Sequence, residues 1–294
     1  MTSTAMTNIK NSEHDVLETP AADVTAADAP AAPADVIDFA DEYGDPVRYD
    51  LEYGTAGLDI AFYLALAEQA DGPVLDIATG TGRIALALTE AGHEVTAVDV
   101  NEAMVDFAIA KDADETVTWV VQDARELKAR GKFGLAIVAG NALQQLLTND
   151  DRTAALKAIY RQLAPGATFA FAIRFPHVAE LARRVETPEI WHSYTDVTGS
   201  QVVVSGTQRY DAASQVMTHE TYRQYAVDGT PAAAPTTTAV RYSFPQELEA
   251  ALAAVCFEVE GTYVDFVGTP LTDQSAATAS ALVYVCRKPE TTKR

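Results

Sequence analysis

One short stretch, VLDIATGTGRIALAL at residues 74–88, constrains the fold more than any other part of the chain. An apolar run that ends in Asp76 predicts a buried strand, and apolar residues at helical spacing after Gly82 predict a helix. Gly80 and Gly82 lie between these two elements. Glycines there allow a tight turn and let the backbone approach a ligand, next to the free N–H groups at a helix start. We interpret the first glycine as the turn residue and the second as the one whose missing Cβ makes room for a ligand.

Strands and helices continue to alternate along the following 90 residues. Buried strands are predicted at residues 73–78, 94–100, 116–122, 132–140 and 166–175, and helices at 83–91, 102–111 and from Asp150 or Asp151 to about Leu163. Asn101 is a typical N-cap for the second helix. This alternation indicates βαβ units, so we expect an α/β fold in which a doubly wound, mostly parallel sheet is covered on both faces.

The pattern changes after residue 175. A short helix at 176–185 and four β segments between 190 and 244, separated by turn residues, predict an antiparallel β insert. A helix at 245–255 and two last strands follow. We therefore divide the chain into a disordered, acidic Ala/Pro-rich tail (1–38), an N-terminal lid with the ligand-binding core (39–175), the insert as substrate lid or dimer contact (176–244), and a segment that completes the core sheet (245–288).

Composition excludes several kinds of partner. The net charge is −21, from 42 acidic and 21 basic residues, so phosphate backbones and anionic membranes would be repelled. We expect no nucleic-acid or membrane partner, no metal site and a cytoplasmic location, because signal-peptide and membrane-spanning patterns are not seen. Cys256 and Cys286 lie in apolar stretches and are expected to be buried thiols.

The acids around the glycine loop bear on which ligand it holds. The loop fits the dinucleotide pattern G-x-G-x-x-A, but Asp76 would repel a pyrophosphate and suits a ligand with a cation, such as the amino group and sulfonium of S-adenosylmethionine. Asp99 ends the second strand. A carboxylate there accepts hydrogen bonds from ribose hydroxyls whether the ligand is a dinucleotide or S-adenosylmethionine. Asp123 follows the third strand and is suited to an adenine amino group, with the Ala124 N–H at a ring nitrogen.

Five segments, in order, resemble the motifs of class I S-adenosylmethionine-dependent methyltransferases: VLDIATGTG, VTAVDVNEAM, VQDA, FGLAIVAGNALQQL and LAPGATFAFAI. The resemblance is strongest to small-molecule enzymes, including N-methyltransferases that act on glycine or on nucleotide-linked amino sugars. It implies a Rossmann-like sheet whose last strand is antiparallel, and S-adenosylmethionine as cofactor. Ala78 departs from the family, which often has Gly or Cys there; we expect Gly80 and Gly82 to keep the turn. The expected cofactor-binding residues are Tyr53, Asp76, Ala78, Thr79, Gly80, Thr81, Gly82, Asp99, Val100, Met104, Asp123, Ala124, Ala139 and Asn141.

The acceptor side is less constrained by sequence. Catalytic candidates are Asn141, His177, His192 and Tyr53, and substrate-binding candidates are Tyr43, Arg48, Arg174, Arg209 and Tyr222. Helix capping, packing of an N-terminal lid or a surface position explains several of them equally well. We expect a small-molecule acceptor and favour nitrogen, because no strong general base is evident; the use of any base stays open, as does a homodimer through the insert.

Three alternatives remain open at this point. The first is a small-molecule O-methyltransferase, and the second is a protein that binds S-adenosylmethionine without catalysis. The third is an NAD-dependent oxidoreductase, which would need a hydride-site set such as Tyr-x-x-x-Lys after the fourth strand. The segment NALQQLLTND contains none.

Overall fold

The computed structural model describes residues 40–54, 57–128 and 132–290, which all belong to one compact unit, Ile37–Arg294. The expected tail at 1–38 lies outside the described residues. Within the described ranges, no helix is both long and apolar enough to cross a membrane.

The core is a seven-stranded sheet in the order β10-β11-β5-β4-β1-β2-β3. Its strands are β1 (Val74–Ile77), β2 (Val95–Asp99), β3 (Val117–Val121), β4 (Phe133–Val138), β5 (Leu163–Arg174), β10 (Glu258–Tyr263) and β11 (Ala281–Arg287). Neighbours from β3 to β5 pair in parallel, whereas β11 is antiparallel to both β5 and β10. The expected mostly parallel sheet with an antiparallel last strand is confirmed.

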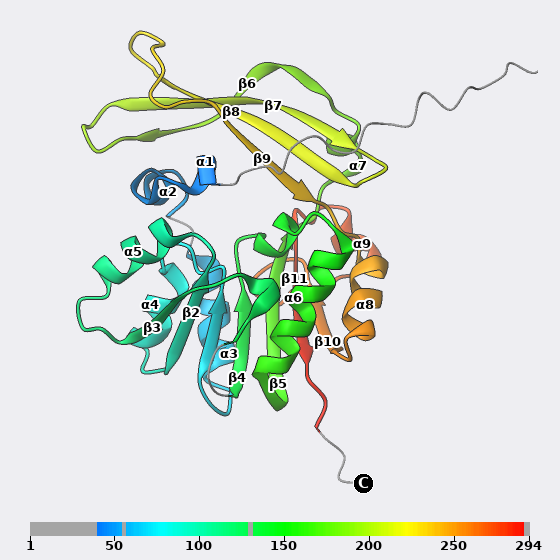
Figure 1. Ribbon diagram of the computed structural model, residues 1–294. Helices are drawn as coiled ribbons and strands as arrows, with labels where there is room; N and C mark the ends of the chain where they lie inside the picture. The colour runs from blue at the N-terminus through cyan, green and yellow to red at the C-terminus, as the bar shows by residue number, and fades with distance from the viewer. Residues whose placement is uncertain (1–39, 55–56, 129–131, 291–294) are drawn as a thin grey trace, which may run out of the picture. The chain divides into compact units, whose positions relative to one another are not determined.

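Helices cover both faces of this sheet (Figure 1). They are α3 (Leu58–Ala67), α4 (Arg83–Glu90), α5 (Glu102–Lys111), α6 (Asn149–Gln162) and α8 (Pro245–Ala254), with short α7 (Val178–Leu181), α9 (Asp273–Ala276), η1 (Ala124–Glu126) and η2 (Ala142–Gln145). Asn101 caps α5 as predicted. The start of α6 differs from the prediction: the helix begins at Asn149, because the Thr148 hydroxyl accepts the Asp151 N–H and so caps the helix slightly earlier.

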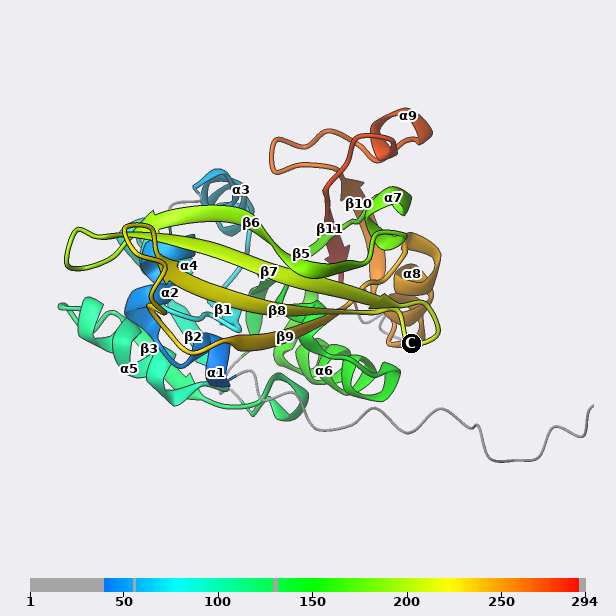
Figure 2. The same cartoon turned by 90° about the horizontal axis from the view of Figure 1, so that it is seen from above.

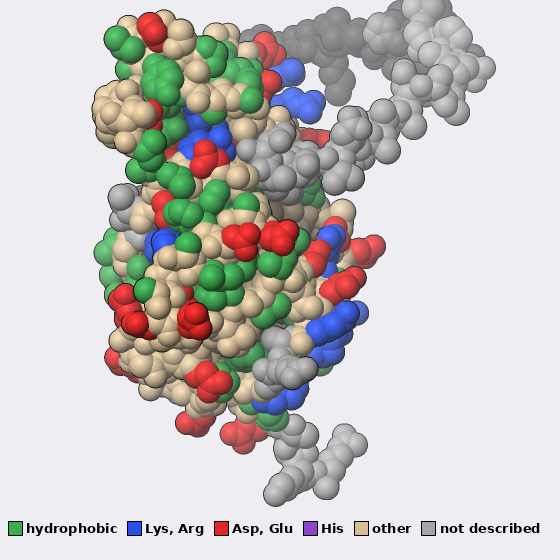
Figure 3. All heavy atoms as spheres, turned by 60° about the vertical axis from the view of Figure 1, so that its left-hand side comes forward, with side chains coloured by type: hydrophobic (Ala, Val, Ile, Leu, Met, Phe, Trp, Pro, Cys, Tyr) green, Lys and Arg blue, Asp and Glu red, His purple; other side chains and the backbone are tan. Residues whose placement is uncertain are grey.

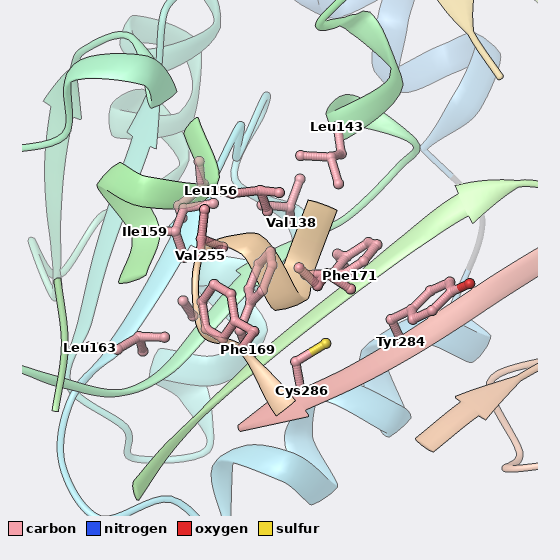
Figure 4. Packing of buried hydrophobic residues seen from close by; sticks show 14 of the residues in the cluster. Val138, Leu143, Leu156, Ile159, Leu163, Phe169, Phe171, Val255, Tyr284 and Cys286 are labelled. Carbon is pink, nitrogen blue, oxygen red and sulfur yellow. The ribbon is translucent and has the colours of Figure 1, made fainter. Parts of the chain in front are cut away.

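Two apolar layers enclose the sheet. One, formed with α6 and α8, includes Phe169 and Phe171 of β5 and Tyr284 of β11 (Figure 4); the other is formed with α3 and α4 around Tyr63. Cys286 is buried in the first layer, but Cys256 is exposed, because it follows α8 in a left-handed turn (φ 69°). The prediction of a buried thiol at Cys256 is therefore wrong.

The insert is a separate antiparallel sheet of β6 (Val185–Thr195), β7 (Gln201–Asp211), β8 (Val216–Tyr225) and β9 (Thr236–Arg241), paired in chain order. This is the predicted meander, although the helix before it covers only Val178–Leu181. Figures 1 and 2 show the insert above the edge of the core sheet where the parallel strands end. Two lid helices, α1 (Ala40–Tyr43) and α2 (Pro46–Tyr53), lie between the insert and the core. Asp45 caps α2 and Pro46 opens its first turn.

Candidate functional site

The glycine loop connects β1 to α4 through a backbone with alternating left-handed residues. Ala78, Gly80 and Gly82 have φ values of 56°, 57° and 82°. Glycine adopts this conformation freely, whereas a residue with a Cβ is strained there by about 1 kcal/mol. Ala78 is thus an alanine at a backbone position that favours glycine, and the turn forms in spite of it.

Gly80 is a turn residue as predicted, but Gly82 differs from the prediction. A Cβ added to Gly82 would lie 2.6 Å from the Trp119 ring of β3, whereas a Cβ added to Gly80 would meet nothing within 4 Å. Gly82 is therefore needed for packing of the loop against Trp119. Gly80 is the residue whose backbone faces open space, where a ligand has room to approach.

Two buried carboxylates lie at the ends of the adjacent strands β1 and β2. Oδ2 of Asp76 accepts from the Thr79 hydroxyl (2.6 Å), and burial raises the pKa of the Asp76 carboxyl to about 7. Asp99 accepts the backbone N–H of Gly80 (2.8 Å) and of Asn101 (2.9 Å), and burial also raises its pKa. Buried carboxylates with raised pKa values are costly to ionise unless a cation or further hydrogen-bond donors arrive.

The third acid, Asp123, follows β3 and caps η1. Its two oxygens accept from the Arg125 guanidinium, Oδ2 at 2.6 Å and Oδ1 at 3.0 Å, and this hydrogen bonding lowers the pKa of Asp123. Next to the ends of β2 and β3, Val100 and Val121 expose 68% and 50% of their surface, which leaves apolar area for a flat ring. Met104 is buried in α5, as a residue that only packs in the helix core would also be.

The loop after β4 brings a polar side chain to the same edge. Gly140 and Asn141 are both left-handed, and Asn141 precedes η2 without a capping hydrogen bond from its side chain. The alternative role of Asn141 as a helix cap is thus not the arrangement found. Buried Gln144 joins this loop to the end of β5, because its amide bonds both the N–H (2.8 Å) and the carbonyl (3.0 Å) of Arg174.

The lid closes over the glycine loop through a row of aromatic rings. The Thr81 hydroxyl donates to Asp50 of α2 at 2.5 Å. From there Tyr43, Tyr49 and Tyr53 are in successive ring contact, with centroids 5.8 and 5.3 Å apart. Tyr53 then meets the ring of His192 on β6 at 6.1 Å. The row leads from the loop to the insert.

Comparisons with known proteins agree with this geometry. Residues 74–166 match the model of the family described as "Methyltransferase domain". The "Putative methyltransferase YqeM" of Bacillus subtilis (strain 168) is 26% identical over 231 residues, which is 75% of this chain and 85% of that protein. The glycine loop, the strand order and this match together decide the family. The chain is a class I S-adenosylmethionine-dependent methyltransferase.

Two other proteins similar to this methyltransferase extend the comparison. A glycine/sarcosine N-methyltransferase of Aphanothece halophytica is 33% identical over 106 residues, 35% of this chain, and the match spans only 40% of that relative's length. The structure of the CcbJ methyltransferase from Streptomyces caelestis has a TM-score of 0.66 at 23% identity, and covers 79% of this chain and 94% of that one. The structural likeness bears on the fold alone.

A buried ion network joins the methyltransferase's lid to its insert. Arg223 of β8 is fully buried; it donates to Glu52 of α2 at 2.8 Å and to Glu42 of α1 at 2.6 Å. Its remaining terminal nitrogen donates to the Thr236 hydroxyl (3.1 Å), which in turn bonds Glu42. His192 Nε2 lies 3.1 Å from Glu52. Removing one partner of such a buried ion pair typically costs about 3–5 kcal/mol, so the network fixes the lid against the insert.

The predicted acceptor residues divide into two groups. Tyr43, Tyr53 and His192 lie together in the aromatic row, and Arg174 lies at the end of β5, where it pairs with Glu180 at 2.5 Å. Residues of the other group lie farther from the aromatic row or already donate a hydrogen bond to another residue. Arg48 donates to the Glu42 carbonyl (2.6 Å), and His177 is exposed at the start of α7.

Arg209 and Tyr222 require a correction as substrate-binding candidates. Arg223 faces the lid, and its cross-strand partner is Val204. Because side chains alternate between the faces of a strand, Tyr222 on β8 and Arg209 on β7 point to the opposite face. The sequence shows that these strands exist, but it does not show which face meets the lid.

Three residues of the lid-facing side were missed or left unassigned. Tyr49 lies in the middle of the aromatic row. The Trp191 ring occupies the space above Gly206, where a Cβ would lie 2.1 Å from it, and its edge meets His219 at 5.8 Å. Burial, with Arg174 nearby, lowers the pKa of His219. Gly206 in the middle of a strand was the available signal, since such glycines mark close approach.

A cavity of about 810 Å³ lies elsewhere in the methyltransferase. Its lining includes Phe62, Gly134, Gly166, Tyr263 and Arg287. Gly134 is the second residue of β4 and Gly166 lies near the start of β5, so this cavity is at the end of the strands away from the glycine loop. It is not part of the cofactor or acceptor site described above.

Proposed function

We propose that this methyltransferase transfers a methyl group to the nitrogen of a small amine. The observation that carries the proposal is the buried network of Arg223, Glu42 and Glu52, which holds the lid and insert together over the strand ends. A macromolecular acceptor would have to disrupt it, whereas a small molecule does not. Acidic side chains scattered over the face shown in Figure 3, and the net charge of −21, also disfavour a nucleic acid.

The loop and the strand ends offer polar groups that match the parts of the cofactor. We propose that Asp76 binds the α-amino group, because its buried carboxylate lacks a fully compensating cation: Arg83 is engaged by Asp59 in a two-pronged pair at 2.6 and 2.7 Å. Asp99 would accept the ribose hydroxyls, and Val100 would cover one face of the adenine. The Asp123 oxygens would receive the adenine amino group beside Arg125, with the N–H of Ala124 at a ring nitrogen.

The remaining cofactor-binding assignments are proposals of the same kind. The loop backbone would surround the methionine end of the cofactor with Ala78, Thr79, Gly80, Thr81 and Gly82. Met104 would support the site from the buried side of α5. Ala139 and Asn141 would face the methyl group from the loop after β4, and Tyr53 from the lid. When bound, S-adenosylmethionine supplies an activated methyl group, so positioning of the acceptor by these residues accounts for much of the catalysis.

Nitrogen is favoured over oxygen for two reasons. The protein carries a net charge of −21, which attracts an ammonium group and repels a phenolate. In addition, the glycine/sarcosine N-methyltransferase similar to this chain acts on amines by its name. Aromatic side chains such as Tyr53 and Trp191 add cation–π attraction for a methylated ammonium product.

The test is incubation with methyl-labelled S-adenosylmethionine and two pools of acceptors, one of small amines and one of phenols. We expect labelled N-methyl products from the amine pool and S-adenosylhomocysteine in equal amount, by mass spectrometry. Label in the phenol pool alone would refute the nitrogen acceptor. Tight cofactor binding with no product from either pool would favour a non-catalytic binding protein.

A further inference from the structure

Two buried carboxylates of the lid share one buried arginine. Glu42 and Glu52 expose 4% and 0% of their side chains, and their common partner Arg223 is fully buried. Glu52 also contacts Nε2 of His192 at 3.1 Å. Through Glu52 the buried network therefore reaches His192.

The contact orients the His192 ring. A carboxylate only accepts hydrogen bonds, so Nε2 of His192 donates to Glu52, and in the neutral ring the lone pair is then on Nδ1. Glu52 is fully buried while 38% of the His192 side chain is exposed, so one end of the pair is anchored and the other is accessible. A base oriented by a buried carboxylate is the arrangement that general-base catalysis uses.

His192 lies on the side of the insert that faces the lid and cofactor loop. Its cross-strand partner Val204 is also the partner of Arg223, and its ring meets Tyr53 at the end of the aromatic row. The charged and titratable groups around it are Glu52, Tyr53 and Arg48 of α2, Glu42 of α1, Arg223 of β8, and Tyr194 of β6 with Asp196 after it. Burial and Glu52 raise the pKa of Tyr194, whereas Arg223 and Arg48 act against the rise. The Tyr53 ring beside His192 suits an ammonium group through cation–π attraction.

We propose that His192, held by Glu52, receives the ammonium group of the acceptor and removes its proton. The N–H bond of the ammonium breaks, the proton binds Nδ1 of His192, and the nitrogen keeps the electron pair. That pair would form the bond to the methyl carbon while the carbon–sulfur bond of the cofactor breaks and leaves its electron pair on sulfur. The resulting imidazolium is stabilised by Glu52 and later loses the proton to solvent. Glu52 is a positioning residue in this step. The assignment rests on the proposed amine acceptor.

The first experiment examines the histidine without turnover. NMR spectra of the full chain with ¹⁵N-labelled histidine give the tautomer of His192, assigned by comparison with His192→Asn. We expect a protonated Nε2 in the wild type and a mixture of tautomers in Glu52→Gln. A wild-type ring protonated mainly at Nδ1, or a ring unaffected by Glu52→Gln in a variant that remains folded, would overturn the pairing.

The second experiment measures the pH dependence of methyl transfer to glycine, benzylamine and glucosamine as probes. His192→Asn should lower kcat by about 10²–10⁴-fold near neutral pH, with KM for S-adenosylmethionine unchanged, and its rate should recover as pH approaches the pKa of the amine. His93 lies in the turn before β2, at the end of the sheet where the parallel strands begin. It provides the matched control His93→Asn, which should behave as wild type.

The outcomes separate this inference from the proposed function. A wild type that methylates none of the amines counts against the proposed acceptor, while the NMR tautomer still decides the Glu52–His192 pair. A wild type that is active on an amine, with a pH profile changed by His219→Asn and not by His192→Asn, overturns the assignment in favour of the other histidine on this face.

Discussion

Replacing Asp76 with asparagine should make the ligand-free protein more stable and at the same time weaken cofactor binding. The Asp76 pKa rises from 3.8 to about 7 on folding. A carboxyl whose native pKa is raised costs stability above its unfolded pKa, and the cost is relieved as pH falls through the native value. A difference of one pKa unit between the folded and unfolded chain corresponds to about 1.4 kcal/mol. The cost is therefore about 4 kcal/mol at pH 8 and about 2 kcal/mol at pH 5.

Asparagine removes this cost and keeps an acceptor for the Thr79 hydroxyl, but it adds an amide NH₂ that must find a partner. If the amide costs about 2 kcal/mol, the net gain is about 2 kcal/mol at pH 8 and close to zero at pH 5. Loss of the buried charge opposite the cofactor's amino group should cost about 3 kcal/mol of S-adenosylmethionine binding, roughly 100-fold in Kd.

The assay is thermal and urea unfolding of both proteins at pH 8 and pH 5, with and without S-adenosylmethionine, and calorimetric titration of the cofactor. For the wild type, Kd should rise up to tenfold for each pH unit below 7, because binding requires the ionised carboxylate. The reasoning is refuted by an Asp76→Asn protein that is less stable than wild type at pH 8 and still binds the cofactor with unchanged affinity.

Four other changes follow from the same structure. Ala78→Gly should stabilise the protein by about 0.5–1 kcal/mol by relieving a left-handed alanine, as unfolding curves would show. Gly82→Ala should destabilise it by at least about 2 kcal/mol, since the new methyl would overlap the Trp119 ring. Asp99→Ala should weaken S-adenosylmethionine binding by about 1–3 kcal/mol in calorimetry; an unchanged affinity contradicts its ribose role. Deletion of residues 1–36 should leave unfolding and cofactor binding nearly intact, and a large loss in either contradicts their assignment as a tail.

Much of the core was predictable because its signals are local. Each parallel strand is a short apolar run, and Asp76, Asp99 and Asp123 end three of them, so the edge at which these acids gather follows from the topology of a parallel sheet. The reversed last strand came only from the resemblance to a known family. The role of Gly82 was predicted wrongly, since nothing in the local sequence shows that Trp119 packs against the loop.

The acceptor side was less predictable because its contacts are distant in sequence. Arg223 meets Glu52 across 171 residues, and neither residue lies in a motif. Arg209 and Tyr222 were chosen on residue type, yet a shift of one residue along a strand turns a side chain to the other face. His192 was a candidate for its chemistry alone; the carboxylate that orients it became evident only in the folded chain.

The most direct measurement is a crystal structure of the protein with S-adenosylhomocysteine. The account predicts that the amino group lies at Asp76, the ribose at Asp99, and the sulfur on the side of the loop that faces Asn141, Tyr53 and His192. A sulfur directed away from the lid and insert, or a cofactor bound without contact to either carboxylate, would contradict it.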